Sequence, residues 1–361
     1  MGPKPTDSPT FGTAFSLYGW SGGYVAFREG WPTDQDGTPT SASIEPWVST
    51  DGSHWKQGHK LTAADPDVEI SGMVWGPAGL MAIGVPEQKV TCGGPELVTG
   101  LWLSKDGLTW TAVDTAQAFG SDRVIDIHGG GAGYIATGLS NDGSIAIDWV
   151  STDGVFWTRH PLSAFKGATV QSAAAFKGGF VMAGYIKGEP GCGDQEIQSV
   201  VWWSTSGLSW QKSVLGTYAA KTDGGMDVER INDQTLIVTH SQNSADFSKV
   251  TETSWTSTDG KTWKSYKGAP SHDFFSGGWV VTNGKRGLFL PGYVFDANDI
   301  RQDVWAFQPD LSLTKLTQKG SLPPNEVDLT FAPGSAAYGP AGVLLVNQDG
   351  TNFWLGVPTA S

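Results

Sequence analysis

Short apolar stretches separated by turn-forming residues recur along the whole chain. Within each recurrence, one apolar stretch ends at a tight turn and a second follows directly. A third carries a tryptophan just before a Ser-x-Asp-Gly-x-x-Trp turn, and a short fourth stretch follows. Each recurrence therefore predicts four antiparallel strands, with glycine supplying the positive φ of the hairpins. The first hairpin turns lie at residues 19–23, 75–79, 129–133, 176–179, 232–234, 283–287 and 338–342.

The serine-containing turn is the clearest repeat. A tryptophan stands two positions before each serine, and weaker copies of this tryptophan are Trp305 and Trp354. Seven hairpin turns and seven such tryptophans give seven units of roughly fifty residues. The turn reads STDGSHW at 49–55, SKDGLTW at 104–110, STDGVFW at 151–157, STSGLSW at 204–210 and STDGKTW at 257–263.

Seven units of four antiparallel strands predict an all-β fold, a seven-bladed β-propeller. A single blade cannot bury both of its faces, so blades stack around an axis and cover each other's apolar sides. The last unit stops after its third strand. We therefore expect the N-terminal segment, around residues 8–12, to supply the fourth strand and close the ring. The predicted organisation is an N-terminal spacer over 1–10 and a single propeller domain over 11–361.

The serine turn resembles the Asp-box (BNR) repeat of sialidase-like propellers, which also occurs in xyloglucanases, sortilin-type receptors and photosystem assembly factors. The resemblance covers about residues 11–357 and implies the propeller fold, but these relatives have unrelated functions. Two departures stand out: Asp and Gly are adjacent here instead of separated by one residue, and Ser206 replaces Asp in the fourth copy. The sixth copy, FQPDLSL at 307–313, has lost the motif. The box residues are expected to stabilise their turn, on the face opposite the binding mouth.

Composition supports strands and argues against several partners. Charged residues make up only 16 % of the 361 residues, and the net charge of −13 argues against a nucleic-acid partner. No apolar run is long enough to predict a membrane span. Twelve of the 17 tryptophans belong to the repeat. The remaining five are Trp20, Trp31, Trp75, Trp203 and Trp279.

The first ten residues and the two cysteines bear on location. MGPKPTDSPT resembles the spacer that follows a cleaved leader, so we expect a mature exported chain that is extracellular, cell-surface or periplasmic, and a monomer. Cys92 and Cys192 each lie twelve residues before the serine of their turn, in units two and four. We predict a disulfide between their long loops, which would also indicate an oxidising compartment. The alternative is two separate thiols in a cytosolic protein.

Several motifs that suggest chemistry have structural explanations. The sequence GWSGG at 19–23 matches a nucleophile elbow but occupies a hairpin turn of the repeat. The six histidines are scattered, and no CxxC, HExxH or phosphate-binding loop occurs, so no metal site is expected. The loops 34–37 and 296–299 are rich in carboxylates and leave calcium open, although Asx turns explain them equally. No other cofactor is expected.

Positions at which the units disagree mark a candidate site at the mouth. An alignment on the hairpin turns puts Arg28 where other units have glycine on their second strand. The position after it is expected to ring the mouth, and Trp31 in a long loop offers a flat platform. The predicted ligand-binding residues are Arg28, Glu29, Trp31, Tyr185, His240 and Tyr293.

Two function classes remain open. The leading hypothesis is an exported, non-catalytic binding or scaffold propeller that recognises a glycan, a peptide or a small molecule at its mouth. The alternative is a sialidase-like glycoside hydrolase or lyase, with Asp126 and Asp227 as the acid/base pair and Arg28 orienting a substrate carboxylate. Sialidases carry an Arg-Ile-Pro motif, which Phe27-Arg28-Glu29-Gly30 does not match, and they require three converging arginines.

Overall fold

The structure is a computed structural model, and its described part includes strands of all seven predicted units. The described residues are 15–30, 43–62, 68–86, 97–143, 146–161, 165, 167–187, 196–219, 224–243, 250–269, 279–290, 294–296, 299–301, 304–316, 336–346 and 353–356. They form antiparallel sheets and one short helix, α1 (Thr115–Phe119).

Seven antiparallel sheets form the blades, each numbered in chain order. Blade 1 contains β1 (Phe15–Trp20), β2 (Gly23–Gly30), β3 (Ser43–Ser49) and β4 (Lys56–Gln57). Blade 2 contains β5 (Val68–Gly76), β6 (Gly79–Pro86), β7 (Gly100–Ser104) and β8 (Thr111–Ala112). Blade 3 contains β9 (Arg123–Gly130), β10 (Gly133–Leu139), β11 (Ala146–Ser151) and β12 (Thr158–Pro161). Blade 4 contains β13 (Ala168–Phe176), β14 (Gly179–Lys187), β15 (Glu196–Ser204) and β16 (Gln211–Ala219).

The remaining blades follow the same order. Blade 5 contains β17 (Gly224–Asn232), β18 (Thr235–Asn243), β19 (Val250–Ser257) and β20 (Lys264–Tyr266). Blade 6 contains β21 (Trp279–Thr282), β22 (Gly287–Leu290), β25 (Trp305–Phe307) and β26 (Leu313–Lys315), with the hairpin β23 (Val294–Asp296) and β24 (Asp299–Arg301) inserted before β25. Blade 7 contains β27 (Ala336–Gly339), β28 (Gly342–Val346) and β29 (Phe353–Gly356).

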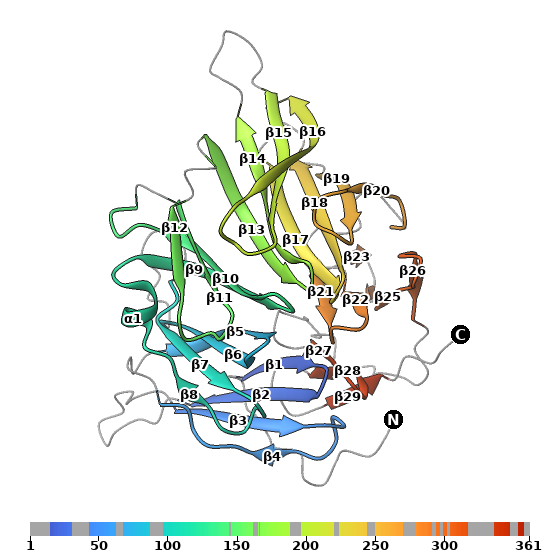
Figure 1. The fold of residues 1–361 in the computed structure, drawn as a ribbon. Coiled ribbons are helices and arrows are strands. Elements are labelled where there is room, and N and C mark those ends of the chain that lie inside the picture. The colour runs from blue at the N-terminus through green and yellow to red at the C-terminus, as the bar shows by residue number, and fades with distance from the viewer. Residues whose placement is uncertain are drawn as a thin grey trace.

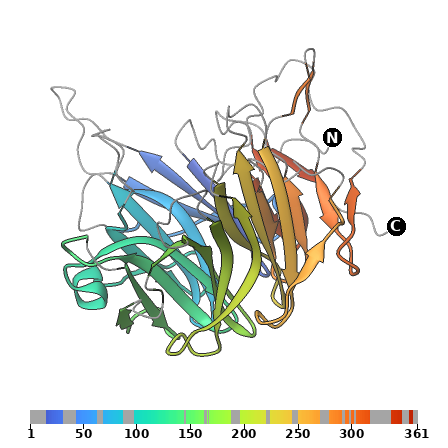
Figure 2. The ribbon, with the colours of Figure 1, turned by 90° about the horizontal axis from the view of Figure 1, so that it is seen from above.

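The blades are arranged in a ring (Figures 1 and 2). The first strand of each blade is innermost and lies beside the first strand of the next blade, and β27 returns to β1. Figure 1 shows β27–β29 beside β1 and β2, where the two ends of the ring meet. This confirms the seven-bladed propeller. The expected closing strand at residues 8–12 lies outside the described residues.

The serine turns have the structural role that their composition predicts. In blade 2, Ser104 Oγ accepts the Gly107 N–H at 2.8 Å, and Asp106 Oδ1 accepts two further backbone N–H groups. Gly107 has a φ of 75°, and the Trp110 ring N–H donates to the Gly107 carbonyl at 2.7 Å. In the fourth copy, Ser206 Oγ accepts a backbone N–H in place of the missing aspartate. The turns are therefore stabilised locally.

Apolar side chains fill the spaces between blades. Trp102, Trp149 and Trp202 of the third strands are at most 2 % exposed. The core between the first two blades joins Phe27 of β2 to Val68 of β5. Such burial between sheets is the main stabilising contribution in a stacked-repeat fold. Among the described residues, no helix has the length and apolar character needed to cross a bilayer.

Candidate functional site

Arg28 is held by an acidic partner within its own blade. Its Nη2 lies 2.6 Å from Glu45 Oε2 on the adjacent strand β3, and Lys60 Nζ lies 3.0 Å from the other oxygen of Glu45. The Glu45 side chain is 9 % exposed and that of Arg28 is 42 % exposed, so this contact is partly open to water. The structure does not bring Arg28 to Asp126 or Asp227. The geometry therefore gives no support to Arg28 as the residue that orients a substrate beside those carboxylates.

Glu29 links two blades. Its Oε1 accepts the Ile70 N–H of β5 at 2.9 Å, and burial raises the pKa of Glu29 to about 7. Glu229 makes the same kind of contact, since its Oε1 accepts the Val280 N–H of β21 at 2.8 Å. An innermost strand is a sheet edge whose unpaired N–H groups need acceptors. Each of these two glutamates therefore accepts a backbone N–H group on the inner edge of the following blade.

His240 is packed between blades 4 and 5. It is 5 % exposed, its ring centre lies 4.4 Å from that of Tyr218, and burial lowers its pKa to about 4. Val238 pairs with Trp255 as Ala26 pairs with Trp47, so His240 occupies the strand position of Arg28 and not that of Glu29. The expected alignment was wrong by one residue in this blade.

A one-residue shift places a side chain on the opposite face of its sheet, where His240 packs against Tyr218 of blade 4. Tyr185 does share the position of Glu29, because Met182 pairs with Trp202. The other predicted mouth and loop residues lie outside the described part of the chain: Trp31, Tyr293, Cys92, Cys192 and the loop 34–37. Asp296 and Asp299 pair at the end of the β23–β24 hairpin. Within the described ranges, no group of three or more His, Cys, Asp or Glu side chains could hold a metal ion.

Asp126 and His128 form a pair on the innermost strand β9. His128 Nε2 lies 2.8 Å from Asp126 Oδ2, and 54 % of the Asp126 side chain remains exposed. Burial by itself raises the pKa of Asp126, but the charge and hydrogen bond of His128 and the Ile127 N–H lower it overall. Burial lowers the pKa of His128, but the neighbouring carboxylates outweigh it and raise that pKa. The pair therefore favours the doubly charged state.

Ser172 connects Asp227 to the neighbouring blade. The Ser172 hydroxyl on β13 donates to Asp227 Oδ1 on β17 at 2.6 Å and accepts the Val228 N–H at 3.2 Å. The Asp227 charge also acts on His128 and raises its pKa. Both predicted aspartates thus belong to one electrostatic cluster on the inner strands of blades 3, 4 and 5. This cluster is our candidate site, which we call the lumen cluster: Asp126, His128, Ser172 and Asp227.

Arg230 and Trp75 meet next to the lumen cluster. The Arg230 guanidinium carbon lies 3.9 Å from the centre of the Trp75 ring, although these residues belong to blades 5 and 2. A Cβ on Gly284 of blade 6 would lie 2.9 Å from the Trp75 ring, so the indole reaches across the axis to two distant blades. Backbone hydrogen bonds also join neighbouring hairpin turns, from Lys177 N to Asp233 O and from Asp233 N to Gly284 O.

The cluster provides hydrogen-bond acceptors more readily than an acid/base pair. A general acid needs a raised pKa, whereas that of Asp126 is lowered. Next to Asp227 on β17, the pKa of Glu229 is instead raised to about 8, because of its burial and the Asp227 charge. The sequence predicted Asp126 and Asp227 but missed His128, Ser172 and Arg230. For Trp75 the sequence offered one signal, because it is one of the five tryptophans that do not belong to the repeat.

Comparisons with known proteins give only distant similarities. No protein-family model matches the chain, and no curated protein sequence matches it. Among solved structures, it is similar to the sialidase of Trypanosoma rangeli, at 13 % identity and a TM-score of 0.42 over 88 % of this chain and 55 % of that one. The chain thus spans about half of that sialidase.

Two further similarities are of the same order. The β-propeller domain of the Trilobed protease from Pyrococcus furiosus has 8 % identity and a TM-score of 0.43, over 80 % of this chain and 79 % of that one. A protein of Parabacteroides distasonis provisionally described as a glycoside hydrolase has 12 % identity and a TM-score of 0.29, over 70 % of this chain and 88 % of that one.

Proposed function

We propose that this protein is a non-catalytic binding propeller that takes a hydroxyl-rich ligand, in the first place a glycan, at the lumen cluster. The supporting observation is that each candidate catalytic side chain already has a partner in the protein. Asp126 is paired with His128, Asp227 with Ser172, and Arg28 with Glu45. Partners of this kind fix the carboxylate oxygens in place, and fixed oxygens are suited to accept hydrogen bonds from ligand hydroxyls.

The acidic character of the lumen cluster narrows the class of ligand. Asp126 and Asp227 are both exposed and carry the negative charge of the cluster, of which the charged His128 offsets one unit, and the whole chain has a net charge of −13. A neutral or cationic ligand is therefore favoured over an anionic one at this position. This also argues against a sialic-acid substrate, whose carboxylate requires arginines.

The alternative remains a glycoside hydrolase or lyase. Its specific support is Glu229, whose pKa is raised to about 8 by burial and by the Asp227 charge, so that Glu229 keeps its proton at neutral pH. In that case Glu229 would replace Asp126 as the acid, and Asp227 would be its partner. The donor bond from Val280 N to Glu229 holds one of the two carboxyl oxygens, which leaves the other for a substrate.

Binding and turnover assays on the same variants distinguish the two functions. We propose a glycan-array screen followed by calorimetry with Asp126→Asn and Asp227→Asn. Asp114→Asn is the matched control, because Asp114 caps α1 outside the cluster and asparagine caps equally well. Loss of binding in the two lumen variants alone supports a binding propeller. Release of aryl glycosides by the wild type, lost in Asp227→Asn or Glu229→Gln, would contradict it.

Export and the cysteine bridge remain part of the proposal. We propose a Cys92–Cys192 disulfide in an exported chain, which would tie the loops of units two and four together. Thiol titration of the denatured, unreduced protein tests it directly. Two free thiols would refute the bridge, and none would support it.

A further inference from the structure

Each serine turn rests on the preceding blade in a regular way. For the turns of blades 1 to 4, the residue after the third-strand tryptophan of the preceding blade provides the seat for the turn glycine. A Cβ on Gly107 would lie 2.9 Å from Val48, and a Cβ on Gly154 would lie 2.9 Å from Leu103. The residue at this strand position is apolar in six of the seven blades and is Thr256 in blade 5. The six are Val48, Leu103, Val150, Trp203, Ala306 and Leu355.

The turn that should rest on Thr256 is the one that has lost its motif. Blade 6 makes a shorter turn there, in which Leu311 has a φ of 66° and its N–H donates to the Gln308 carbonyl at 2.8 Å. This φ lies in the left-handed region, which costs free energy for a residue other than glycine. The polar seat and the missing glycine therefore occur at the same junction.

A side chain holds the altered turn away from blade 5. At the junction of blades 1 and 2, the Leu108 carbonyl accepts a backbone bond from His59 N at 2.9 Å. Leu311 corresponds to Leu108, since each lies six residues after its strand tryptophan. Its carbonyl instead accepts from the Tyr266 hydroxyl at 2.8 Å. A bond from a tyrosine side chain thus takes the place of a direct backbone bond, and a gap remains between the turn of blade 6 and blade 5.

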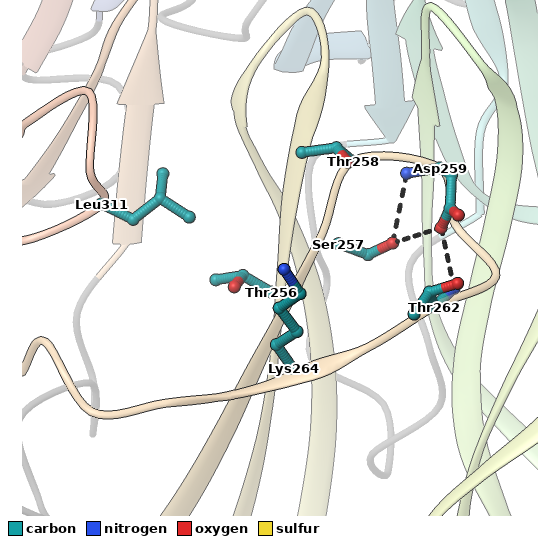
Figure 3. A pocket seen from close by; sticks show the side chains of 7 residues that line it. All are labelled: Thr256, Ser257, Thr258, Asp259, Thr262, Lys264 and Leu311. Carbon is teal, nitrogen blue, oxygen red and sulfur yellow. Dashed lines mark hydrogen bonds between the residues drawn. The ribbon is translucent and has the colours of Figure 1, made fainter.

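This gap is a hollow of about 340 Å³ between blades 5 and 6, drawn in Figure 3. Figure 3 shows Leu311 on one wall and the serine turn of blade 5 on the other. We call it the seat hollow. It is lined by Thr256, Ser257, Thr258, Asp259, Thr262, Lys264 and Leu311.

The lining groups divide into occupied and available ones. Asp259 Oδ1 is occupied, because it accepts the Ser257 hydroxyl and the backbone N–H groups of Lys261 and Thr262. Within the described part of the chain, no hydrogen bond or ion pair occupies the side chains of Thr256, Thr258 and Lys264. The available hydrogen-bond donors are thus two hydroxyls and one ammonium group.

We propose that the seat hollow binds a small hydroxylated carboxylate, such as a uronic-acid residue of a saccharide. The Lys264 ammonium and the threonine hydroxyls supply donors for a carboxylate, and a charge-assisted bond is about twice as strong as a neutral one. The hollow falls within the usual size range of small-ligand sites. Leu311 offers an apolar contact to a sugar ring. This site is separate from the proposed function of the lumen cluster and does not depend on it.

Calorimetry with sodium glucuronate and with glucose, at fixed ionic strength, tests the proposal. Thr256→Val restores the seat residue of blades 1 and 3, and Lys264→Met removes the charge. Lys56→Met is the matched control, because Lys56 pairs with Val48 as Lys264 pairs with Thr256, at a junction where the seat is filled. Thermal melting checks that each variant is folded.

We expect saturable glucuronate binding with a Kd on the order of 1 mM, weakened at least tenfold by Thr256→Val and by Lys264→Met and unchanged by Lys56→Met. Glucose should bind at least about tenfold more weakly than glucuronate. The proposal is overturned if glucuronate shows no saturable binding, if both hollow variants bind it like the wild type, or if glucose binds equally well.

Discussion

The guanidinium of Arg230 stacks on the ring of Trp75 at 3.9 Å and so joins blade 5 to blade 2 across the axis of the propeller. Burial lowers the pKa of Arg230 to about 10, which leaves it charged at neutral pH. A cation–π contact removed from water contributes more than one at the surface. Neighbouring blades already share apolar cores, whereas this contact joins blades that are not neighbours.

A double-mutant cycle measures this cross-axis contact. We expect Trp75→Leu and Arg230→Gln to show a coupling free energy of about 1–2 kcal/mol in urea unfolding. The matched cycle is Trp203→Leu with Lys261→Gln, whose ammonium lies 4.2 Å from the Trp203 ring on an exposed side chain. That coupling should be smaller, about 0.5 kcal/mol. Equal couplings would show that the cross-axis position adds nothing.

Glu229 should make stability depend on alkaline pH. Its pKa rises from 4.5 to about 8, first because of burial and then because of the Asp227 charge. A raised folded-state pKa gives stability that is complete below pH 4.5 and is lost as the pH rises through 8. Glu229→Gln keeps an acceptor for Val280 N but cannot ionise. Between pH 5 and pH 9, we expect the free energy of unfolding to fall by about 2–4 kcal/mol less in this variant than in the wild type.

Unfolding by urea at several pH values checks this expectation. Glu229→Ala serves as the second variant, because it leaves the Val280 N–H without its acceptor and should cost about 1–3 kcal/mol at every pH. If Glu229→Gln follows the wild-type pH profile, ionisation of Glu229 does not limit stability.

Asp148 should cause a second loss of stability at neutral pH. It is fully buried on β11, both carboxyl oxygens lack hydrogen-bond partners in the described part of the chain, and burial raises its pKa from 3.8 to about 7. The nearest titratable group is His160, whose Nδ1 lies 3.5 Å away and whose pKa is lowered by burial. Stability from Asp148 is complete below pH 3.8 and lost as the pH rises through 7.

Asp148→Asn removes the charge with little change in shape. We expect it to unfold like the wild type near pH 4 and to be more stable by up to about 4 kcal/mol at pH 8. Asp122→Asn is the control, since Asp122, unlike Asp148, has an ion-pair partner, Arg159 at 2.6 Å. A constant difference across this pH range would contradict the prediction.

His128 should report on the lumen cluster directly. Its pKa is raised by the charges of Asp126 and Asp227. Removing one charge with Asp126→Asn should lower the His128 pKa, because burial then dominates. Histidine NMR over pH 4–9 measures it, and His240, whose pKa of about 4 results from burial alone, is the internal control. An unchanged His128 pKa in Asp126→Asn would show that the Asp126 charge does not raise the pKa of His128.

Ring closure by the N-terminus is tested by shortening the chain. A protein that begins at Thr13 would lack the predicted fourth strand of blade 7 and would expose the edge of β29. We expect a loss of about 3 kcal/mol or more and a lower melting temperature. A melting temperature equal to that of the full chain would place closure elsewhere.

The fold was predictable because its signals are repeated. Trp102, Trp149 and Trp202 each occupy the same place in a separate unit, so an error in one unit could not change the architecture. The site has no such redundancy. Glu29 and His240 both depart from the repeat, but a departure does not show whether a side chain faces the lumen or the next blade. That depends on strand register, and the shift of one residue in blade 5 reversed the outcome for His240.

Contacts between distant blades were beyond sequence analysis for another reason. Ser172 and Asp227 meet because blades 4 and 5 are neighbours, and their pairing depends on the distance between two inner strands. Trp75 and Arg230 meet only after the ring has closed. No local pattern of residues records such a distance.

The indole of Trp75 lies across the end of the lumen where the hairpin turns bond to one another, and this has a kinetic consequence. If a solute cannot pass that end, it reaches Asp126 or Asp227 and leaves again through the mouth alone. Arrival and departure then share one gate, so an obstacle at the mouth would slow both rates equally and leave the affinity unchanged. In that case, replacing Trp75 with a small residue would open a second exit, and a solute could enter the lumen at one end and leave at the other.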